Sequence, residues 1–179
     1  MEEDSLARVA ALLRDRNAVD AELAWLIQRP MTSGHLGEWI AAKVFDIELE
    51  TSAAAAGIDG CFRSGPLQGK TVNVKWYLKR EGMLDTTESP ALDYYLVLCG
   101  PPSTAVSSRG STRPWRIEAV YLFDARQLRS EQIARGVKRG VASSVIQQQW
   151  TSAEIYPSPV NPRLAVTPQQ AQQLQLFVL

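Results

Sequence analysis

The sequence predicts a folded α/β protein, and three observations carry this prediction. Apolar residues recur at helical spacing over residues 5–28. Residues 71–77 alternate between apolar and polar side chains, which is typical of a strand with one buried face. Residues 93–99 form a continuous apolar run of strand length. Helical and strand segments therefore alternate along the chain, which favours helices packed on a sheet.

Length and composition indicate one domain, residues 1–179. The chain is 45% apolar and 21% charged, as expected of a globular protein with a substantial core. Nineteen Lys and Arg residues balance nineteen Asp and Glu residues, so the net charge is zero. A protein that holds duplex DNA alone through many phosphates is usually more basic. The balance weighs against tight DNA binding by the isolated chain, although a local basic groove is compatible with it.

Cysteine content and the N-terminus predict a cytoplasmic protein. Cys61 and Cys99 lie in predicted strands, and we expect buried free thiols in a reducing compartment. With one histidine in the chain, the cysteines do not make a zinc site. The acidic start lacks the basic and apolar regions of a signal peptide, and no apolar run approaches the roughly 20 residues of a membrane span.

The first 45 residues are predicted to be helical. Residues 5–28 form one long helix, or two broken near Asn17, in an N-terminal helical segment covering 1–30. A second helix over 34–45 is expected to begin after Ser33 as its N-cap. At 100° per residue, Glu38 lies on the face of that helix expected to pack on the sheet. A buried carboxylate needs a partner, so Glu38 is a candidate site residue.

Residues 57–77 predict two short strands joined by a Gly/Pro turn. In the second strand, Asn73 and Lys75 point to one face and the valines between them to the other. If the strands pair as an antiparallel hairpin, Asp59 joins that face. A carboxylate, an amide and an ammonium group would then share one small patch.

The remaining elements follow in order. We predict strands over 93–99 and 115–123, a Pro- and Ser-rich mobile loop between them, and a helix capped by Asp124 that runs to about residue 134. Residues 136–150 form a helix or an ordered loop. Thr167 opens a final helix, with Pro168 at its first position and Gln170 at its third. This gives a core over 33–135 and a C-terminal extension over 136–179.

The order Glu38, Asp59, Asn73-Val74-Lys75 resembles the PD-(D/E)XK nuclease superfamily. The most similar subgroup pattern has a helix reading G-x-L-G-E, a strand reading G-Y-D and a next strand reading Q-[IV]-K. The corresponding segments here are GHLGE at 34–38, GID at 57–59 and NVK at 73–75, and the Asp-Tyr that opens the 93–99 strand is similar too. The resemblance covers 33–100, a little over a third of the chain.

The resemblance implies a restriction-endonuclease-like core with a mixed central sheet flanked by helices. It also implies a Mg²⁺-dependent nuclease that hydrolyses phosphodiester bonds, of DNA in preference to RNA. Asp59, Asn73 and the Val74 carbonyl would hold Mg²⁺ or Mn²⁺, with Glu38 acting directly or through water. Lys75 would orient or help to deprotonate the attacking water and stabilise charge on the phosphate.

One departure from the pattern supports an alternative. The superfamily usually has Glu, Asp or Gln where this chain has Asn73, and an uncharged, shorter side chain weakens metal binding. The alternative is a nuclease-fold protein with impaired catalysis that binds nucleic acid or a protein. Asp59 would then be a turn residue and Lys75 an ordinary strand lysine. A homodimer or a protein partner is compatible with both hypotheses.

Four further residues are candidates for nucleic-acid contact on either hypothesis. Each also has a simpler interpretation. The histidine would only begin a helix, the tyrosine would line the cleft or pack in the fold, and the two basic residues would form a solvated strand end. They are His35, Tyr77, Lys79 and Arg80.

Overall fold

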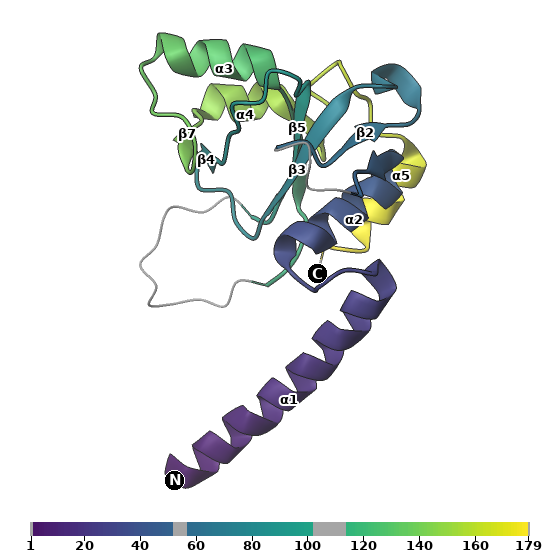
Figure 1. Ribbon diagram of the computed structural model, residues 1–179, viewed down its shortest axis with the longest axis vertical. Helices are drawn as coiled ribbons and strands as arrows, with labels where there is room; N and C mark the ends of the chain where they lie inside the picture. Colours follow the sequence, from purple (N-terminus) through teal and green to yellow (C-terminus); the bar gives the residue numbers. More distant parts are fainter. Residues whose placement is uncertain (1, 52–56, 102–113, 179) are drawn as a thin grey trace.

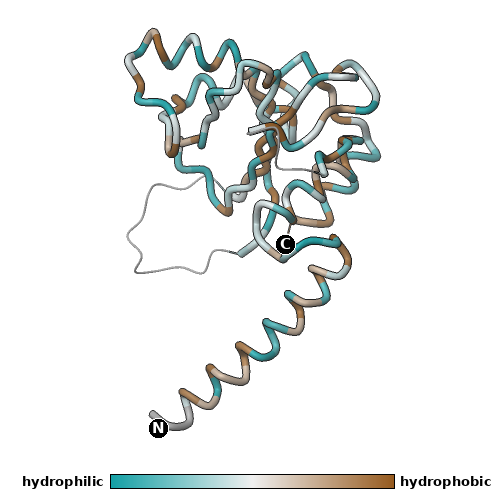
Figure 2. Tube along the Cα trace, viewed as in Figure 1, coloured by the Kyte–Doolittle hydropathy of each residue, from teal (hydrophilic) through white to brown (hydrophobic). Residues whose placement is uncertain are grey.

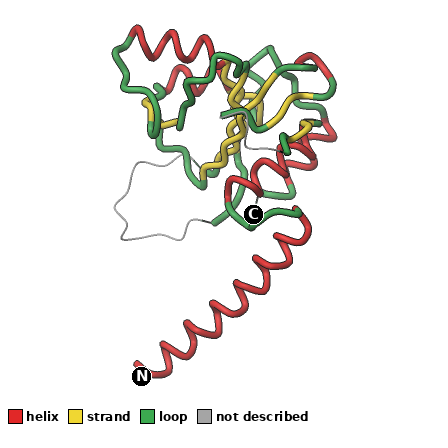
Figure 3. Tube along the Cα trace, in the orientation of Figure 1, coloured by secondary structure: helices red, strands yellow, loops and turns green. Residues whose placement is uncertain are grey.

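The protein is an α/β sandwich of three layers, seen in a computed structural model that describes residues 2–51, 57–101 and 114–178. One mixed sheet lies between two pairs of helices, and a long N-terminal helix projects from this body (Figure 1). Figure 3 shows the strands gathered at the centre, with helices on both sides. The predicted α/β class and mixed sheet flanked by helices are confirmed.

The central sheet has six strands in the order β1-β2-β3-β5-β6-β8. The pair β3–β5 is parallel and every other pair is antiparallel. A separate two-stranded sheet joins β4 (Met83–Leu84) to β7 (Ser143–Ser144). The strands of the main sheet are β1 (Ile47–Leu49), β2 (Gly60–Phe62), β3 (Thr71–Tyr77), β5 (Tyr94–Cys99), β6 (Ala119–Asp124) and β8 (Glu154–Tyr156).

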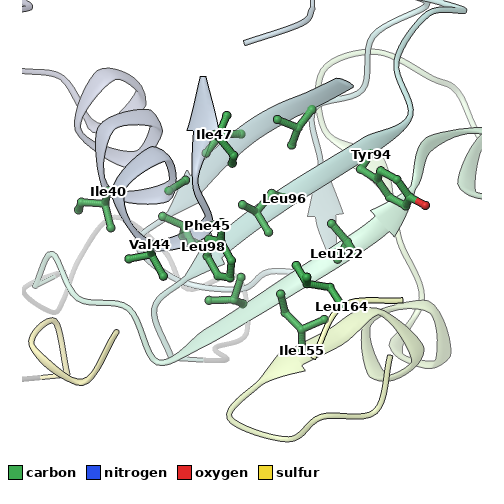
Figure 4. Close-up of a cluster of buried hydrophobic side chains, with 14 of the residues drawn as sticks. Ile40, Val44, Phe45, Ile47, Tyr94, Leu96, Leu98, Leu122, Ile155 and Leu164 are labelled. Carbon is green, nitrogen blue, oxygen red and sulfur yellow. The ribbon is translucent and has the colours of Figure 1, made fainter. Parts of the chain in front are cut away.

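Helices cover both faces of this sheet. On one face, α2 (Ser33–Phe45) and α5 (Pro168–Gln175) bury the larger core cluster. Figure 4 shows Val44 and Phe45 of α2 lying close to Leu98 of β5. On the other face, α3 (Ala125–Ala134) and α4 (Gln147–Ala153) cover a second cluster that includes Trp150. All six residues of β5 are buried. Because both faces of this strand are covered by helices, its sequence is a continuous apolar run.

Several predicted elements are confirmed. The hairpin forms as expected, with a short 3₁₀ turn, Gly65–Leu67, between β2 and β3. Asp124 caps α3, because its carboxylate accepts hydrogen bonds from the N–H groups of Arg126 and Gln127. Thr167 and Gln170 form the capping box of α5. The N-terminal segment is one unbroken helix, α1 (Glu2–Ile27).

Other predictions need correction. The N-cap of α2 is Thr32 and not Ser33, because the Thr32 hydroxyl accepts the N–H of His35 at 3.1 Å. The predicted 115–123 strand is shorter and begins at Ala119. Residues 136–150, which were expected to form a helix or an ordered loop, contain a loop, the short strand β7 and the start of α4. Strand β1 was not predicted. Most of the predicted 100–114 loop lies outside the described residues.

The expectation of buried free thiols is confirmed for Cys99 and needs correction for Cys61. Both cysteines are free, and burial raises the pKa of the Cys99 thiol to about 12, which keeps it protonated and unreactive. Cys61 is only half-buried. Within the described residues, no helix has the length and apolar character needed to cross a membrane.

Candidate functional site

The candidate site lies at the edge of β3 where the pairing with β2 ends. That pairing joins Gly60 to Val72 and Cys61 to Thr71. Asp59 precedes the first of these pairs, and its N–H still donates to the Val72 carbonyl at 2.9 Å. One residue further along this edge, the N–H of Val74 donates to Oδ2 of Asp59 at 2.7 Å. The Asp59 carboxylate thus continues the ladder and satisfies a strand N–H group.

The Val74 carbonyl also faces this edge. The N–H and C=O of one strand residue point to the same side, toward the same neighbour. The side chain of Val74 belongs to the core cluster beneath α2, so its main chain alone is available at the edge. The prediction that a Val74 oxygen lies beside Asp59 is therefore consistent with the local backbone.

Helix α2 brings Glu38 close to Asp59 because α2 approaches β3 very closely. A Cβ atom on Gly37 would lie 2.9 Å from Cβ of Trp76, so a glycine is needed for this contact. The adjacent Glu38 is largely buried, with 16% of its side chain exposed. Gly37, the residue before Glu38, is therefore required for the close packing of α2 on β3.

Arg29 is the partner of Glu38, and the sequence interpretation missed it. The Arg29 guanidinium donates a hydrogen bond to Oε2 of Glu38 and forms an ion pair with it. Arg29 lies in the turn after α1, where Gln28 adopts a left-handed conformation with φ 56°. No spacing rule relates a turn residue to a carboxylate nine positions later, so the sequence offered no signal for this pair.

The electrostatics of Asp59 show that these groups converge on it. Burial raises the pKa of Asp59, and the nearby Glu38 carboxylate raises it further. The hydrogen bond from the Val74 N–H opposes that rise, as do the positive charges of Lys75 and Arg29. Two carboxylates and two cations thus lie within electrostatic range of each other around the open edge of β3.

Asn73 is the most unusual residue of the predicted set. Its side chain is 3% exposed, and its Oδ1 atom has no hydrogen-bond partner within the described part of the chain. A buried oxygen acceptor without a donor costs free energy unless something else, such as a water or a cation, satisfies it. Asn73 lies next to Val74, so this oxygen belongs to the same short stretch of β3.

These residues fit a hard cation better than a transition metal. Across residues 2–51, 57–101 and 114–178, no three His, Cys, Asp or Glu side chains are grouped to hold a metal ion. The candidate donors are two carboxylates, an amide oxygen and a main-chain carbonyl, and oxygen donors of these kinds suit Mg²⁺. The orphaned Asn73 oxygen is the observation that favours such an ion.

The connection over residues 85–90 packs close to the same part of the sheet. A Cβ atom on Gly57 would lie 2.4 Å from Oγ1 of Thr87, and Gly57 has φ +79°. Tyr95, which is paired in register with Asn73, accepts the Thr87 N–H on its hydroxyl at 2.8 Å. The glycine of the GID segment therefore has a local packing reason.

The four candidate nucleic-acid contacts all have internal partners. The His35 ring nitrogen lies 2.8 Å from the Pro30 carbonyl. The Tyr77 hydroxyl accepts the Asp85 N–H at 2.9 Å, and burial raises the tyrosine pKa. Lys79 is ion-paired with Glu81. His35 therefore contacts the turn before α2, Tyr77 packs beside the second core cluster, and Lys79 is paired with a neighbouring residue.

Arg80, the fourth of these residues, is held among aromatic rings. Its guanidinium lies 5.5 Å from the Trp150 ring centroid and 5.9 Å from that of Tyr121. It also donates a hydrogen bond to Oε1 of Gln147 at 3.0 Å. Arg80 therefore joins the segment after β3 to β6 and α4 through cation–π contacts.

The fold and the site together define a three-layer α/β protein with a carboxylate, amide and lysine cluster at the open edge of a central strand. No protein-family model and no curated protein sequence matches the chain.

Proposed function

We propose that this protein is a Mg²⁺-dependent nuclease of the PD-(D/E)XK type, with DNA as its expected substrate. The observation that carries the proposal is the convergence of Glu38 and Lys75 on Asp59 at the open edge of β3. The order of these residues supports the restriction-endonuclease-like core inferred from the sequence. Glu38 lies on a helix, Lys75 lies on the second strand of a hairpin, and Asp59, which the sequence predicted within the first strand, immediately precedes that strand.

Four oxygen donors would hold the metal ion. They are the free carboxylate oxygen of Asp59, Oδ1 of Asn73, the Val74 carbonyl and, directly or through water, Glu38. When bound, Mg²⁺ would neutralise charge on the scissile phosphate and lower the pKa of the attacking water. The burial of Asp59 favours a bound cation, because a positive charge relieves the cost of keeping this carboxylate ionised.

Lys75 supplies one of the chain's own positive charges at this site. It lies two residues after Asn73 on β3, so alternation places both on the same face of the sheet. An ammonium group in this position would orient the attacking water and stabilise the negative charge that develops on the phosphate. Mn²⁺, which accepts the same oxygen donors, should replace Mg²⁺.

The test is cleavage of single- and double-stranded DNA with Mg²⁺ or Mn²⁺. Asp59→Asn and Lys75→Ala should each lower the rate by roughly a hundredfold or more, because each removes a charge at the reacting phosphate. The other end of β3 offers matched controls. Asp93 also accepts a strand N–H, from Thr71 at 3.0 Å, and Lys70 lies 3.5 Å from it.

Asp93→Asn and Lys70→Ala remove the same chemical groups away from the site and should leave cleavage within a few fold of wild type. Absence of cleavage by the wild-type protein with both metals, over a range of DNA substrates, would overturn the catalytic proposal. Equal losses in the Asp59 and Asp93 variants would show that cleavage does not depend specifically on the Asp59 carboxylate.

The alternative is a nuclease-fold protein that binds nucleic acid or a protein without hydrolysis, and two observations favour it. The Arg29 guanidinium already neutralises Glu38, so this carboxylate is satisfied without a metal ion. The internal contacts of Tyr77 and Arg80 likewise use groups that would otherwise be available to a substrate.

Arg29→Gln distinguishes the two proposals. If Glu38 helps to hold Mg²⁺, removing the competing guanidinium should tighten Mg²⁺ binding by roughly threefold to tenfold in a calorimetric titration. If Glu38 is only structural, the variant should lose stability with no change in Mg²⁺ affinity. Arg63→Gln, which breaks an exposed ion pair with Asp46, is the control and should change neither quantity appreciably.

A further inference from the structure

Helix α1 exposes an apolar stripe that has no cover within the described residues. The helix projects from the body, and Figure 2 shows apolar residues recurring along its length. Val9, Leu12, Val19 and Leu26 are between 49% and 57% exposed. With 26 residues and a rise of 1.5 Å per residue, α1 is about 39 Å long. A helix that leaves the body is marginal in water unless its apolar face is buried.

The stripe has the spacing of a coiled-coil seam. Residues alternate at intervals of four and three, which keeps one line of side chains facing a partner helix. The seam positions are Ser5, Val9, Leu12, Arg16, Val19, Leu23 and Leu26. Arg16 is the single charged residue among them, and it forms an ion pair with Asp20 at 3.5 Å.

The C-terminal half of this seam is continuous with an apolar groove. The groove runs between α1 and the body, and Val19, Leu23 and Leu26 form its α1 wall. Its opposite wall includes Trp39 of α2 and Trp115. A helix seated there would touch both α1 and the body.

We propose that two copies of this chain associate through α1 in an antiparallel pair. In this arrangement the protruding N-terminal half of each α1 lies along the C-terminal half of the other, at the mouth of its groove. A two-fold axis uses the same surface on both copies and closes the assembly at a dimer. Both unpartnered features, the exposed stripe and the groove, are then covered together.

Charge complementarity and coverage of the groove together favour this direction and register. When Val9 packs on Val19 of the second copy, the flanking position of Arg8 falls beside Glu22 of the second copy, and the two-fold axis produces this pair twice. The same register brings Leu13 beside Leu13 of the second copy and Leu12 against the aliphatic stem of Arg16 of the second copy. The same register also brings Asp15 beside Asp15 of the second copy at the two-fold axis, and the two Arg8–Glu22 pairs outweigh this single like-charge contact.

The competing arrangements place like charges together. In a parallel pair in register, Arg16 would face Arg16 of the second copy within the seam, and Asp15 would flank Asp20 of the second copy. An antiparallel pair shifted by one heptad, with Val9 on Leu26, would place Asp15 beside Glu22 of the second copy. Both competing arrangements therefore have like-charge contacts without opposite-charge ones, whereas opposite-charge contacts predominate in the proposed register.

Sedimentation of the full chain, at concentrations up to roughly 0.1 mM, tests the proposal over the range where micromolar dimers are populated. The wild type should sediment at twice the mass of one chain. Leu12→Asp should raise the dimer dissociation constant by roughly a hundredfold or more, because it buries a charge in the seam. Ala21→Asp is the matched control, since it adds the same charge to the outer face of α1, and it should leave the dimer intact.

Charge reversal tests the register. Arg8→Glu and Glu22→Arg should each weaken the dimer by roughly tenfold, and the double variant should recover most of the wild-type affinity. These exposed changes leave the body of the protein folded, which circular dichroism checks. A wild-type protein that stays monomeric, or a dimer insensitive to Leu12→Asp, would overturn the proposal. A dimer that Leu12→Asp breaks but that shows no charge-reversal rescue would overturn the antiparallel register.

Discussion

At the scale of single residues, Asp59 combines a structural and a chemical role. Its carboxylate satisfies the Val74 N–H at the point where β2 leaves β3, and it lies among Glu38, Lys75 and Arg29. Burial that raises the pKa of a carboxyl group makes its ionised form less favourable in free energy. Buried carboxylates of this kind are often found at functional sites, because a bound substrate or ion can offset that free-energy cost.

Asp59→Asn should therefore stabilise the metal-free protein at neutral pH. The pKa of Asp59 is raised by folding, so the folded state binds its proton more tightly than the unfolded chain does. The cost of the ionised carboxylate is fully present above the folded-state pKa. It decreases as the pH falls through that value toward the ordinary aspartate pKa of 3.8. The advantage of the Asn variant should shrink over the same window.

Denaturant unfolding of the two proteins between pH 7 and pH 4, without divalent metal, measures this difference. Asp93→Asn should behave in the opposite sense. Hydrogen bonds from Thr71 and the charge of Lys70 outweigh partial burial and lower the pKa of Asp93, so this substitution should cost stability at neutral pH. That cost should disappear as acid protonates Asp93. A pH-independent difference for Asp59→Asn would contradict the assignment of a buried, ionised carboxylate.

At the scale of elements, the contact between α2 and β3 sets the position of the site. Gly37 lets the helix lie against Trp76, and the next residue is Glu38. Glycine is normally unfavourable inside a helix by about 1 kcal/mol relative to alanine. The sequence retains it here because a Cβ atom would push α2 away from the strand.

Gly37→Ala should destabilise the protein by roughly 1–2 kcal/mol, since overpacking against Trp76 outweighs the gain in helix propensity. It should also lower cleavage by displacing Glu38. Gly34→Ala provides the control within the same helix, because the atom nearest to its added Cβ is Thr32 Oγ1 at 3.9 Å. That variant should be neutral or slightly stabilising in thermal unfolding. Equal effects of the two substitutions would argue against the close contact.

At the scale of the whole molecule, the C-terminal part of the chain completes the body that carries the site. Strand β8 extends the sheet beside β6, and α5 covers the same face as α2. Gln170 of α5 donates a hydrogen bond to the Val44 carbonyl at 3.0 Å, across 126 positions of sequence. The segment predicted as a C-terminal extension thus contributes both a strand and core residues.

Leu174→Ala should accordingly destabilise the whole domain by roughly 2–5 kcal/mol, because Leu174 is fully buried in the core cluster beneath α2. Leu176→Ala, two residues later, removes the same atoms from a side chain that is 72% exposed and should change stability by less than about 0.5 kcal/mol. Chemical denaturation of both variants measures the difference. Similar stabilities for the two would show that α5 is not part of the cooperative core.

The sequence alone determined the features that depend on neighbouring residues. Period-two alternation predicted β3, a continuous apolar run predicted β5, and the Asp124 and Thr167 caps predicted where α3 and α5 begin. These features are local, because a strand's two faces and a helix's first turn are fixed within a few residues. The candidate residues Glu38, Asp59, Asn73 and Lys75 were likewise named from their order and context.

Only the tertiary structure decided which groups meet. The ion pair of Arg29 with Glu38, the orphaned oxygen of Asn73, the place of β8 in the sheet and the exposed seam of α1 all depend on packing between distant segments. The physical reason is that side-chain partners are chosen by helix–sheet geometry and chain turns, which no local periodicity encodes. Apolar residues recur at helical spacing in both α1 and α2. In α2 these side chains are buried against the sheet, whereas in α1 most of them are exposed, and only the tertiary structure shows this difference.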